Sequence, residues 1–244
     1  FSNHTGYGSW KGRVFDGPAI EELVEGIAER GVLDRCDGVL SGYMGSADIG
    51  NAILSAVARV RALNPQALYC CDPVIGDVGR GVFVRPGIPE FMRNQAVPAA
   101  DIITPNQFEL DYLSGLATDT LDSVKEAVSA VQLTGPKVVL VTSLESRETP
   151  EDCIDLLAAE GGRFWRVRTP KLSINVNGAG DAVSALFFVH YARSRSAASA
   201  VGAASASIYG LLKRTAEAGS REILTVEAQD EFVDPTWRFE VEEV

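Results

Sequence analysis

Apolar residues along the chain follow two alternating patterns, helical spacing and short unbroken runs. The first helical segment opens at Asp16-Gly17-Pro18, a cap followed by proline, and Gly31 is expected to end it. Its apolar positions keep the spacing of one helix face: Ile20, Leu23, Val24, Ile27 and Ala28. A second such segment is capped by Ser46 and stopped by Asn64-Pro65. Both are predicted to be amphipathic helices.

Short apolar runs alternate with helical segments through the rest of the chain. They predict strands over residues 36–44, 67–71, 101–104 and 137–142. Helices are expected over residues 107–113, 122–133, 179–194 and 197–213. Apolar strands that alternate with helices favour an α/β fold, with a mostly parallel central sheet covered by helices on both faces. The length of 244 residues suits a single domain over residues 1–244.

Two segments depart from this alternation. Residues 153–158 and 163–168 flank Glu160-Gly161-Gly162, which predicts an antiparallel hairpin at the edge of the sheet. Residues 76–87 hold four glycines around the charged centre Asp77-Val78-Gly79-Arg80, and we expect them to form a mobile loop.

Composition excludes several classes of function. A net charge of −11, with 22 scattered Lys and Arg residues, argues against a nucleic-acid surface. The acidic run at residues 240–243 is expected to be a solvated tail. The four cysteines form no C-x-x-C pair, so neither a zinc site nor a disulfide framework is predicted. The sequence contains no run long enough for a membrane span and no signal-like opening, which makes the cytoplasm the expected location.

The first candidate for chemistry is the stretch Asn177-Gly178-Ala179-Gly180-Asp181, which leads directly into an apolar helical run. Its two glycines let the backbone approach a ligand closely, and the unpaired amides at a helix start attract anionic oxygens. Asp181 would then lie beside a bound anion. The alternative is that Asp181 only caps the helix.

Polar residues also follow the predicted parallel strands, whose carboxyl ends are the usual ligand site of such a sheet. They are Asp72, Thr104, Asn106, Glu109, Thr142 and Ser143. The alternatives are structural: a turn at Asp72, a helix cap at Asn106, a first-turn carboxylate at Glu109 and a strand position at Thr142. Their convergence on one edge, beside the glycine turn, predicts a shared site.

Carboxylates, hydroxyls and an anion-binding helix start together indicate phosphoryl transfer. Because carboxylates alone would repel a triphosphate, a bound Mg²⁺ is expected, with Asp72 and Glu109 as ligands. Asp181 is the candidate base for an attacking hydroxyl, and the amides of Ala179 and Gly180 would stabilise the transferring group. The sequence contains neither a Walker-type G-x-x-x-x-G-K-[ST] nor a G-x-G-x-x-G motif. P-loop ATPases, protein kinases and dinucleotide oxidoreductases therefore lose their main support.

At this point the motifs show a family resemblance. Residues 177–181 resemble the anion-hole motif of the ribokinase-like superfamily, and Thr104-Pro105-Asn106-Gln107-Phe108-Glu109 resembles its N-x-x-E metal motif. Further segments resemble the pyridoxal kinases: Phe1-Ser2-Asn3-His4-Thr5-Gly6-Tyr7, Trp10-Lys11-Gly12, Leu40-Ser41-Gly42-Tyr43 and Cys71-Asp72-Pro73-Val74-Ile75-Gly76-Asp77. The similarity runs over nearly all of the chain.

The resemblance implies a ribokinase-like fold and ATP-dependent phosphorylation of the 5′-hydroxymethyl group of pyridoxal, pyridoxine or pyridoxamine. It also implies a homodimer that uses Mg²⁺, with K⁺ as a candidate monovalent cation. The segment of residues 76–87 would be a lid over ATP that excludes water before transfer.

The resemblance also implies roles for individual residues. Asp181 would be the base, and Gly178, Ala179 and Gly180 would form the anion hole. The residues facing metal and phosphates would be Asp72, Asp77 and Glu109. The nucleotide site would be lined by Asp72, Thr104, Asn106, Glu109, Thr142, Ser143, Thr169, Pro170, Lys171 and Leu172. The pyridine ring would be surrounded by Phe1, Thr5, Gly6 and Tyr43, with Asp181 at the reacting hydroxyl. From the sequence alone, however, a tyrosine such as Tyr43 is more often a core residue than a ligand residue.

Three departures from the family pattern bear on these expectations. Family members begin with a further segment of roughly forty residues, including a first strand and a serine near the substrate, whereas this sequence starts at Phe1. Asn177 stands where an apolar residue is expected over the ring, and Val84 stands where some members have a lid tyrosine. The alternatives are a hydroxymethylpyrimidine or sugar kinase of the same superfamily, and a catalytically silent protein that binds vitamin B6 or a nucleotide.

Overall fold

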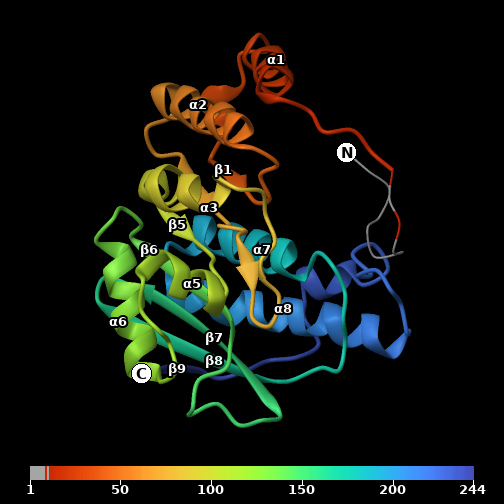
Figure 1. Cartoon of the computed structure of the whole chain (residues 1–244). Helices are drawn as coiled ribbons and strands as arrows, with labels where there is room; N and C mark the ends of the chain where they lie inside the picture. The colour runs from red at the N-terminus through yellow and green to blue at the C-terminus, as the bar shows by residue number, and fades with distance from the viewer. Residues whose placement is uncertain (1–8, 10) are drawn as a thin grey trace.

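The computed structural model describes Ser9 and residues 11–244, which build a seven-stranded sheet in the order β1-β2-β5-β6-β7-β8-β9 (Figure 1). The strands are β1 (Gly38–Ser41), β2 (Leu68–Cys71), β5 (Ile102–Ile103), β6 (Val138–Leu144), β7 (Cys153–Glu160), β8 (Arg163–Pro170) and β9 (Val241–Glu243). The pairs β1–β2, β2–β5 and β5–β6 are parallel, and the pairs from β6 to β9 are antiparallel. This arrangement confirms the predicted α/β sheet and its hairpin of β7 and β8.

The parallel strands are in register at their carboxyl ends. Ser41 lies opposite Cys71, and Cys71 lies opposite Ile103. Because parallel neighbours run in the same direction, the residues that follow these positions leave the sheet at one edge. The polar residues that come directly after β1, β2 and β5 are therefore brought together by the register.

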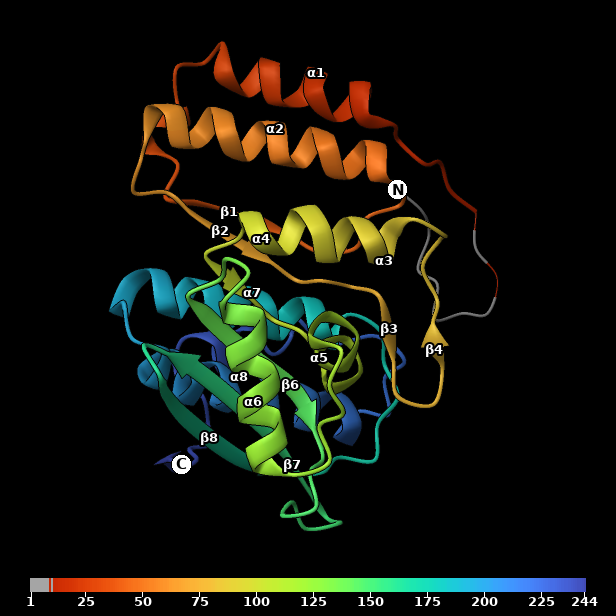
Figure 2. The same cartoon turned by 60° about the vertical axis from the view of Figure 1, so that its left-hand side comes forward.

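Helices cover both faces of the sheet (Figure 2). They are α1 (Gly17–Ala28), α2 (Ala47–Leu63), α3 (Ile88–Phe91), α4 (Val97–Ala99), α5 (Gln107–Ser114), α6 (Leu121–Gln132), α7 (Ala179–Ser194) and α8 (Ala197–Glu217). One face packs against α2 to α6, and the other packs against α7 and α8. Helix α1 lies alongside α2, where the Glu25 carboxylate accepts a hydrogen bond from Arg59 (2.7 Å).

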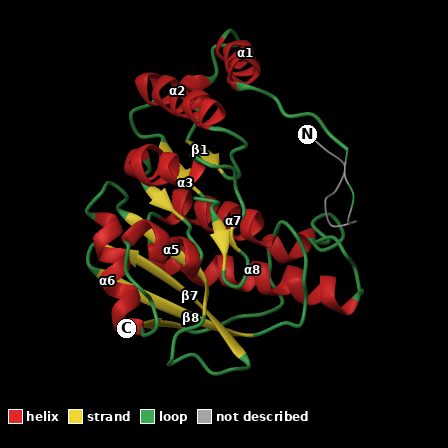
Figure 3. Cartoon of the chain, in the orientation of Figure 1, coloured by secondary structure: helices red, strands yellow, loops and turns green. Residues whose placement is uncertain are grey.

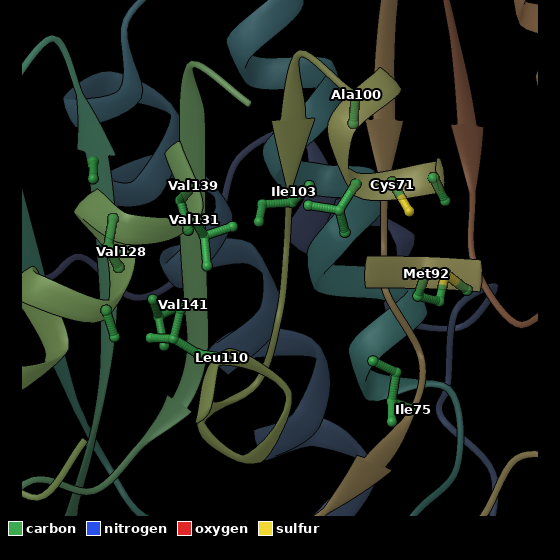
Figure 4. Packing of buried hydrophobic residues seen from close by; sticks show 14 of the residues in the cluster. Cys71, Ile75, Met92, Ala100, Ile103, Leu110, Val128, Val131, Val139 and Val141 are labelled. Atoms are coloured by element: carbon green, nitrogen blue, oxygen red, sulfur yellow. The ribbon is translucent and has the colours of Figure 1, made fainter. Parts of the chain in front are cut away.

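Alternating strand residues build the two halves of the core. Cys71, Ile103, Val139 and Val141 face the layer of α2 to α6 (Figure 4). The intervening residues pack against α7 and α8 instead: Cys70, Ile102, Val138 and Leu140. Strands that are apolar on both faces are what a parallel sheet between two helical layers requires.

Several predicted helix boundaries are confirmed by their caps. The Asp16 side chain accepts from the Ala19 amide (3.1 Å), and the Ser46 side chain accepts from the Ile49 amide (3.3 Å). Helix α7 has the predicted bounds, whereas α1 ends at Ala28, before Gly31. The strand expected over residues 36–44 is shorter, because only Gly38–Ser41 pairs with β2.

The segment of residues 76–87, expected to be a loop, contains a short hairpin. Its first part is a small antiparallel hairpin of β3 (Gly76–Asp77) and β4 (Gly81–Val82), with Gly76 opposite Val82. Gly79 has φ +80° in the turn, a conformation that glycine adopts without strain. Residues 88–99 then form α3, a π-helical turn (Met92–Ala96) and α4, although no helix was predicted there. Both Pro89 and Pro98 stand at the first turns of these short helices, where proline is tolerated.

The prediction of a solvated acidic tail is wrong. Residues 241–243 form β9, whose backbone pairs with β8, while their side chains stay exposed. Glu242 forms an ion pair with Arg166, and Glu243 forms one with Arg163. Opposite charges across neighbouring strands stabilise the pairing, so the acidic residues are part of the sheet edge.

None of the helices in the described part of the chain combines the length and the hydropathy that crossing a bilayer would need.

Candidate functional site

A cavity of about 1180 Å³ lies at the carboxyl ends of the parallel strands. Every predicted site residue within the described residues lines it: Tyr43, Asp72, Asp77, Thr104, Asn106, Glu109, Thr142, Ser143, Thr169, Pro170, Lys171, Leu172, Gly178, Ala179, Gly180 and Asp181. Phe1, Thr5 and Gly6 lie outside the described residues. The structure thus gathers the predicted residues in one place, and their individual roles stay predictions.

The start of α7 forms one wall of the cavity. Gly178 precedes the helix with φ +89°, and no side chain caps the helix start. The amides of the first turn are therefore left for a ligand or solvent. Asp181 lies in this turn and is exposed, and the N-cap position itself is occupied by Gly178, which has no side chain. Figure 3 shows a loop between β8 and α7, and it covers the residues between Pro170 and Ala179.

The end of β1 lies directly beside this carboxylate. A Cβ placed on Gly42 would be 3.4 Å from Asp181 Oδ1, so the backbone at Gly42 runs close to the candidate base. The neighbouring Tyr43 is 60% exposed and lines the cavity, which excludes the core position that the sequence left open for it. A flat acceptor between Tyr43 and Asp181 would meet an aromatic ring on one side and a carboxylate on the other.

Asp72 is a buried carboxylate at the end of β2. It is 7% exposed, and burial raises its pKa to about 8, with the negative charges of Glu109 and Asp181 adding to the effect. Hydrogen bonding by the hydroxyls of Ser184 and Thr104 opposes this increase in the pKa. Those two hydroxyls also bond to each other (2.8 Å), which links α7 to the end of β5. Ser184 was not predicted as a site residue, because a small residue in an apolar helix is typical of close packing.

Asn106 and Glu109 form the start of α5. The Asn106 side chain accepts from the Glu109 amide (2.9 Å), and Glu109 Oε2 accepts from the Asn106 amide (2.9 Å), a reciprocal capping box. The structural alternative for Asn106, a helix cap, is therefore confirmed. Glu109 is buried, and burial raises its pKa to about 7. The backbone amides that donate hydrogen bonds to its carboxylate oppose this increase and lower the pKa.

The β3–β4 hairpin brings two charged residues to the cavity, Asp77 and Arg80. Asp77 is exposed, and its Oδ1 accepts from the next amide, that of Val78 (2.8 Å). The Arg80 guanidinium lies 4.9 Å from the ring centroid of Phe83, which also lines the cavity. Val84 is 9% exposed and belongs to the core, and no role at the site was predicted for it.

Strand β6 ends at the cavity with an irregular backbone. The register with β7 shifts between Val141 and Leu144, and Ser143 lies there with φ +50°. A bulge of this kind turns side chains out of the strand pattern and is common beside functional sites. The Thr142 amide donates to the Pro105 carbonyl (2.9 Å), which holds this strand end against the segment before α5.

The cavity lining also includes residues that sequence reasoning missed. One face of α8 reaches the cavity: Ser205, Ile208, Tyr209 and Leu212. Leu156 of β7 and Val183 of α7 complete an apolar region beside them. The α8 residues have the spacing of any helix face that packs against a core. The sequence therefore contained no signal that distinguished residues lining a cavity from residues of the core. Asn177 also lines the cavity and is exposed, a position that suits a polar residue.

The carboxylates do not form a metal cage by themselves. Among Ser9 and residues 11–244, no group of three or more His, Cys, Asp or Glu side chains is arranged to hold a metal ion. Mg²⁺ in phosphoryl-transfer sites is usually bound by one or two carboxylates together with substrate phosphates and waters. Asp72 fits such a role, because a cation would offset the charge of a buried carboxylate. Glu109 fits direct coordination less well, since backbone amides already bind both of its oxygens.

Comparison with known proteins agrees with this site. A family model described as phosphomethylpyrimidine kinase matches residues 20–226. The pyridoxal kinase PdxY of Granulibacter bethesdensis is 58% identical over 243 residues, which cover 98% of this chain and 85% of that protein. The PdxY of Rubrobacter xylanophilus is 53% identical over 245 residues, with 100% of this chain and 84% of that protein covered. The structure of pyridoxal kinase from Leishmania donovani in complex with ADP and pyridoxamine superimposes with a TM-score of 0.89 at 27% identity, over 99% of this chain and 86% of that one. The chain therefore belongs to the phosphomethylpyrimidine kinase family and, within it, to the pyridoxal kinases.

Proposed function

We propose that this protein transfers the γ-phosphoryl group of ATP to the 5′-hydroxymethyl group of pyridoxal, giving pyridoxal 5′-phosphate, and that it also accepts pyridoxine and pyridoxamine. The observation that carries the proposal is the position of Asp181, in the uncapped first turn of α7 and beside the backbone of Gly42. A base next to free helix amides suits the attack of a hydroxyl on a phosphoryl group. The names of the close relatives support pyridoxal as the acceptor.

In the proposed reaction, each residue of the site has its own role. Asp181 takes the proton of the attacking hydroxyl, and the amides of Ala179 and Gly180 stabilise the negative charge on the transferring group. Tyr43 holds the pyridine ring beside Asp181. Asp72 faces the phosphates with Mg²⁺, which would neutralise the charge of the triphosphate when bound.

The nucleotide lies along the remaining lining. Thr142, Ser143 and the segment 169–172 provide polar and backbone groups at the ends of β6 and β8. The apolar region of α8, with Ile208 and Leu212, suits the faces of a nucleobase. The β3–β4 hairpin covers the phosphates, and Arg80 supplies positive charge there.

The test is a steady-state assay of the purified chain with ATP and Mg²⁺. We expect kcat/KM for pyridoxal to exceed that for hydroxymethylpyrimidine by about tenfold or more. A preference for hydroxymethylpyrimidine would support the other kinase of this superfamily. Tight binding of pyridoxal without any ATP-dependent product would support a silent binding protein and reject the proposal.

The Ser184–Thr104 hydroxyl pair gives a second prediction. Ser184→Ala and Thr104→Val each remove one hydroxyl beside Asp72, and each is expected to lower kcat by about tenfold with little change in KM for pyridoxal. The double variant should lose less than the product of the two single effects, because both changes break the bond between the two hydroxyls. Thr104→Ser keeps the hydroxyl and is the matched control. Equal activity of Thr104→Val and Thr104→Ser would show that the pair does not position Asp72.

We further propose that the enzyme acts as a cytoplasmic homodimer and that K⁺ supports its activity. Family resemblance supports both statements. Light scattering of the purified chain should give twice the mass of one chain, and replacing K⁺ with Na⁺ should lower the rate.

A further inference from the structure

The N-x-x-E segment contacts the base of the β3–β4 hairpin, residues 75 and 76, through three hydrogen bonds, and a fourth lies within the segment itself. Glu109 Oε1 accepts from the amide of Ile75 (2.9 Å) and, more weakly, from that of Gly76 (3.4 Å). Its Oε2 accepts from the amide of Asn106 (2.9 Å). The Asn106 side-chain amide in turn donates to the carbonyl of Gly76 (2.8 Å). Both polar groups of Gly76 are thus bound by side chains of this one segment.

Close packing also fixes the position of Gly76. A Cβ on Gly76 would lie 2.4 Å from Phe108 Cε1 and 2.4 Å from the carbonyl oxygen of Gly81. Only glycine fits between the first turn of α5 and the opposite strand of the hairpin. The Phe83 amide donates to the Ile75 carbonyl (3.2 Å), which continues the hairpin pairing one step further. The base of the hairpin is therefore enclosed by α5 on one side and by β4 on the other.

These contacts occupy most of the hydrogen-bond acceptor positions of the Glu109 carboxylate. A carboxylate offers about four acceptor positions, and the backbone amides of Ile75, Gly76 and Asn106 fill three of them. The residue is also 4% exposed, so little of it faces the cavity. A direct metal ligand would need a free oxygen directed at the metal, whereas an anchor needs the bonds that are present.

We propose that Asn106 and Glu109 are positioning residues that fix the base of the β3–β4 hairpin, and thereby hold Asp77 and Arg80 at the mouth of the cavity. The importance of this position for catalysis rests on the proposed phosphoryl transfer. The anchoring itself does not, because all of its contacts are within the chain. The motif that resembles a metal motif acts here on the backbone of the hairpin.

Hydrogen exchange of the full chain, without nucleotide and with a chelator, tests the anchoring directly. Glu109→Gln loses the charged acceptor, and the amides of residues 75–83 are expected to exchange about 10- to 100-fold faster, while those of α8 keep their protection. Asn106→Ser keeps a good helix cap but cannot reach Gly76, so it should show the same local effect with α5 intact. Glu90→Gln, an exposed residue of α3, is the matched control and should change nothing.

Kinetics then connects the anchoring to catalysis. Glu109→Gln and Asn106→Ser are expected to raise KM for ATP about tenfold, and Arg80→Ala is expected to do the same without faster exchange at residues 75–83. Unchanged exchange at residues 75–83 in both anchor variants would overturn the proposal, whatever happens to the rate. Since exchange is measured without ATP, a chain that phosphorylates no pyridoxal would still decide the question.

Discussion

Asp181→Asn is expected to lower kcat for pyridoxal phosphorylation by about 10²- to 10⁴-fold, because the variant cannot take the proton of the attacking hydroxyl. Asn has nearly the same shape as Asp, and Asp181 is exposed, so the fold should tolerate the change. KM for pyridoxal and for ATP should stay within a few-fold, since binding does not need the base. Steady-state kinetics with both substrates varied will separate kcat from KM.

The matched control is Asp122→Asn. Asp122 is also an exposed carboxylate in the first turn of a helix, in this case α6, and it does not line the cavity. Both changes remove a negative charge from a helix start, which costs about 0.3–1 kcal/mol of stability, and at Asp181 the loss of repulsion with Asp72 offsets part of that cost. Only Asp181→Asn should lose activity. A kcat close to that of the unchanged protein would remove Asp181 from the role of base and leave it as a helix-end carboxylate.

The glycine turn before α7 could be predicted because its function depends on local backbone geometry. Gly178 takes a positive φ, α7 begins at Ala179, and Asp181 falls in the first turn, all within a few residues of sequence. The strand-end residues could be predicted for a related reason. Parallel strands in register deliver Asp72 and Thr104 to the same edge, whatever the details of packing.

Long-range contacts explain what the sequence did not reveal. Residues 241–243 pair with β8, and Arg163 and Arg166, which lie 80 and 76 positions earlier, form ion pairs with their carboxylates. The sequence shows only an acidic run. In the same way, the capping role of Asn106 was open to prediction, but the bonds from Ile75 and Gly76 to Glu109 join segments 34 and 33 residues apart. The sequence alone therefore favoured the metal role for Glu109.

Asp72→Asn is expected to stabilise the chain when no nucleotide or metal is bound, and to do so more at pH 8 than at pH 5. The pKa of Asp72 rises from its usual 3.8 to about 8 in the folded protein, mainly through burial, with Glu109 and Asp181 contributing. The folded state thus binds this proton more tightly than the unfolded state does. Stability is therefore lost as the pH rises from about 4 through about 8, where the buried carboxyl ionises.

Asparagine at this position carries no charge, so the variant does not lose stability in this way. We expect its advantage in free energy of unfolding to grow by about 2–4 kcal/mol between pH 5 and pH 8. Urea unfolding at both pH values, with a chelator present, will measure this change in the free energy of unfolding. The same variant should have low kinase activity, because the charge that destabilises the empty site is the one that faces phosphates and metal. Equal pH dependence of Asp72→Asn and the unchanged protein would show that Asp72 is not the group whose ionisation destabilises the fold.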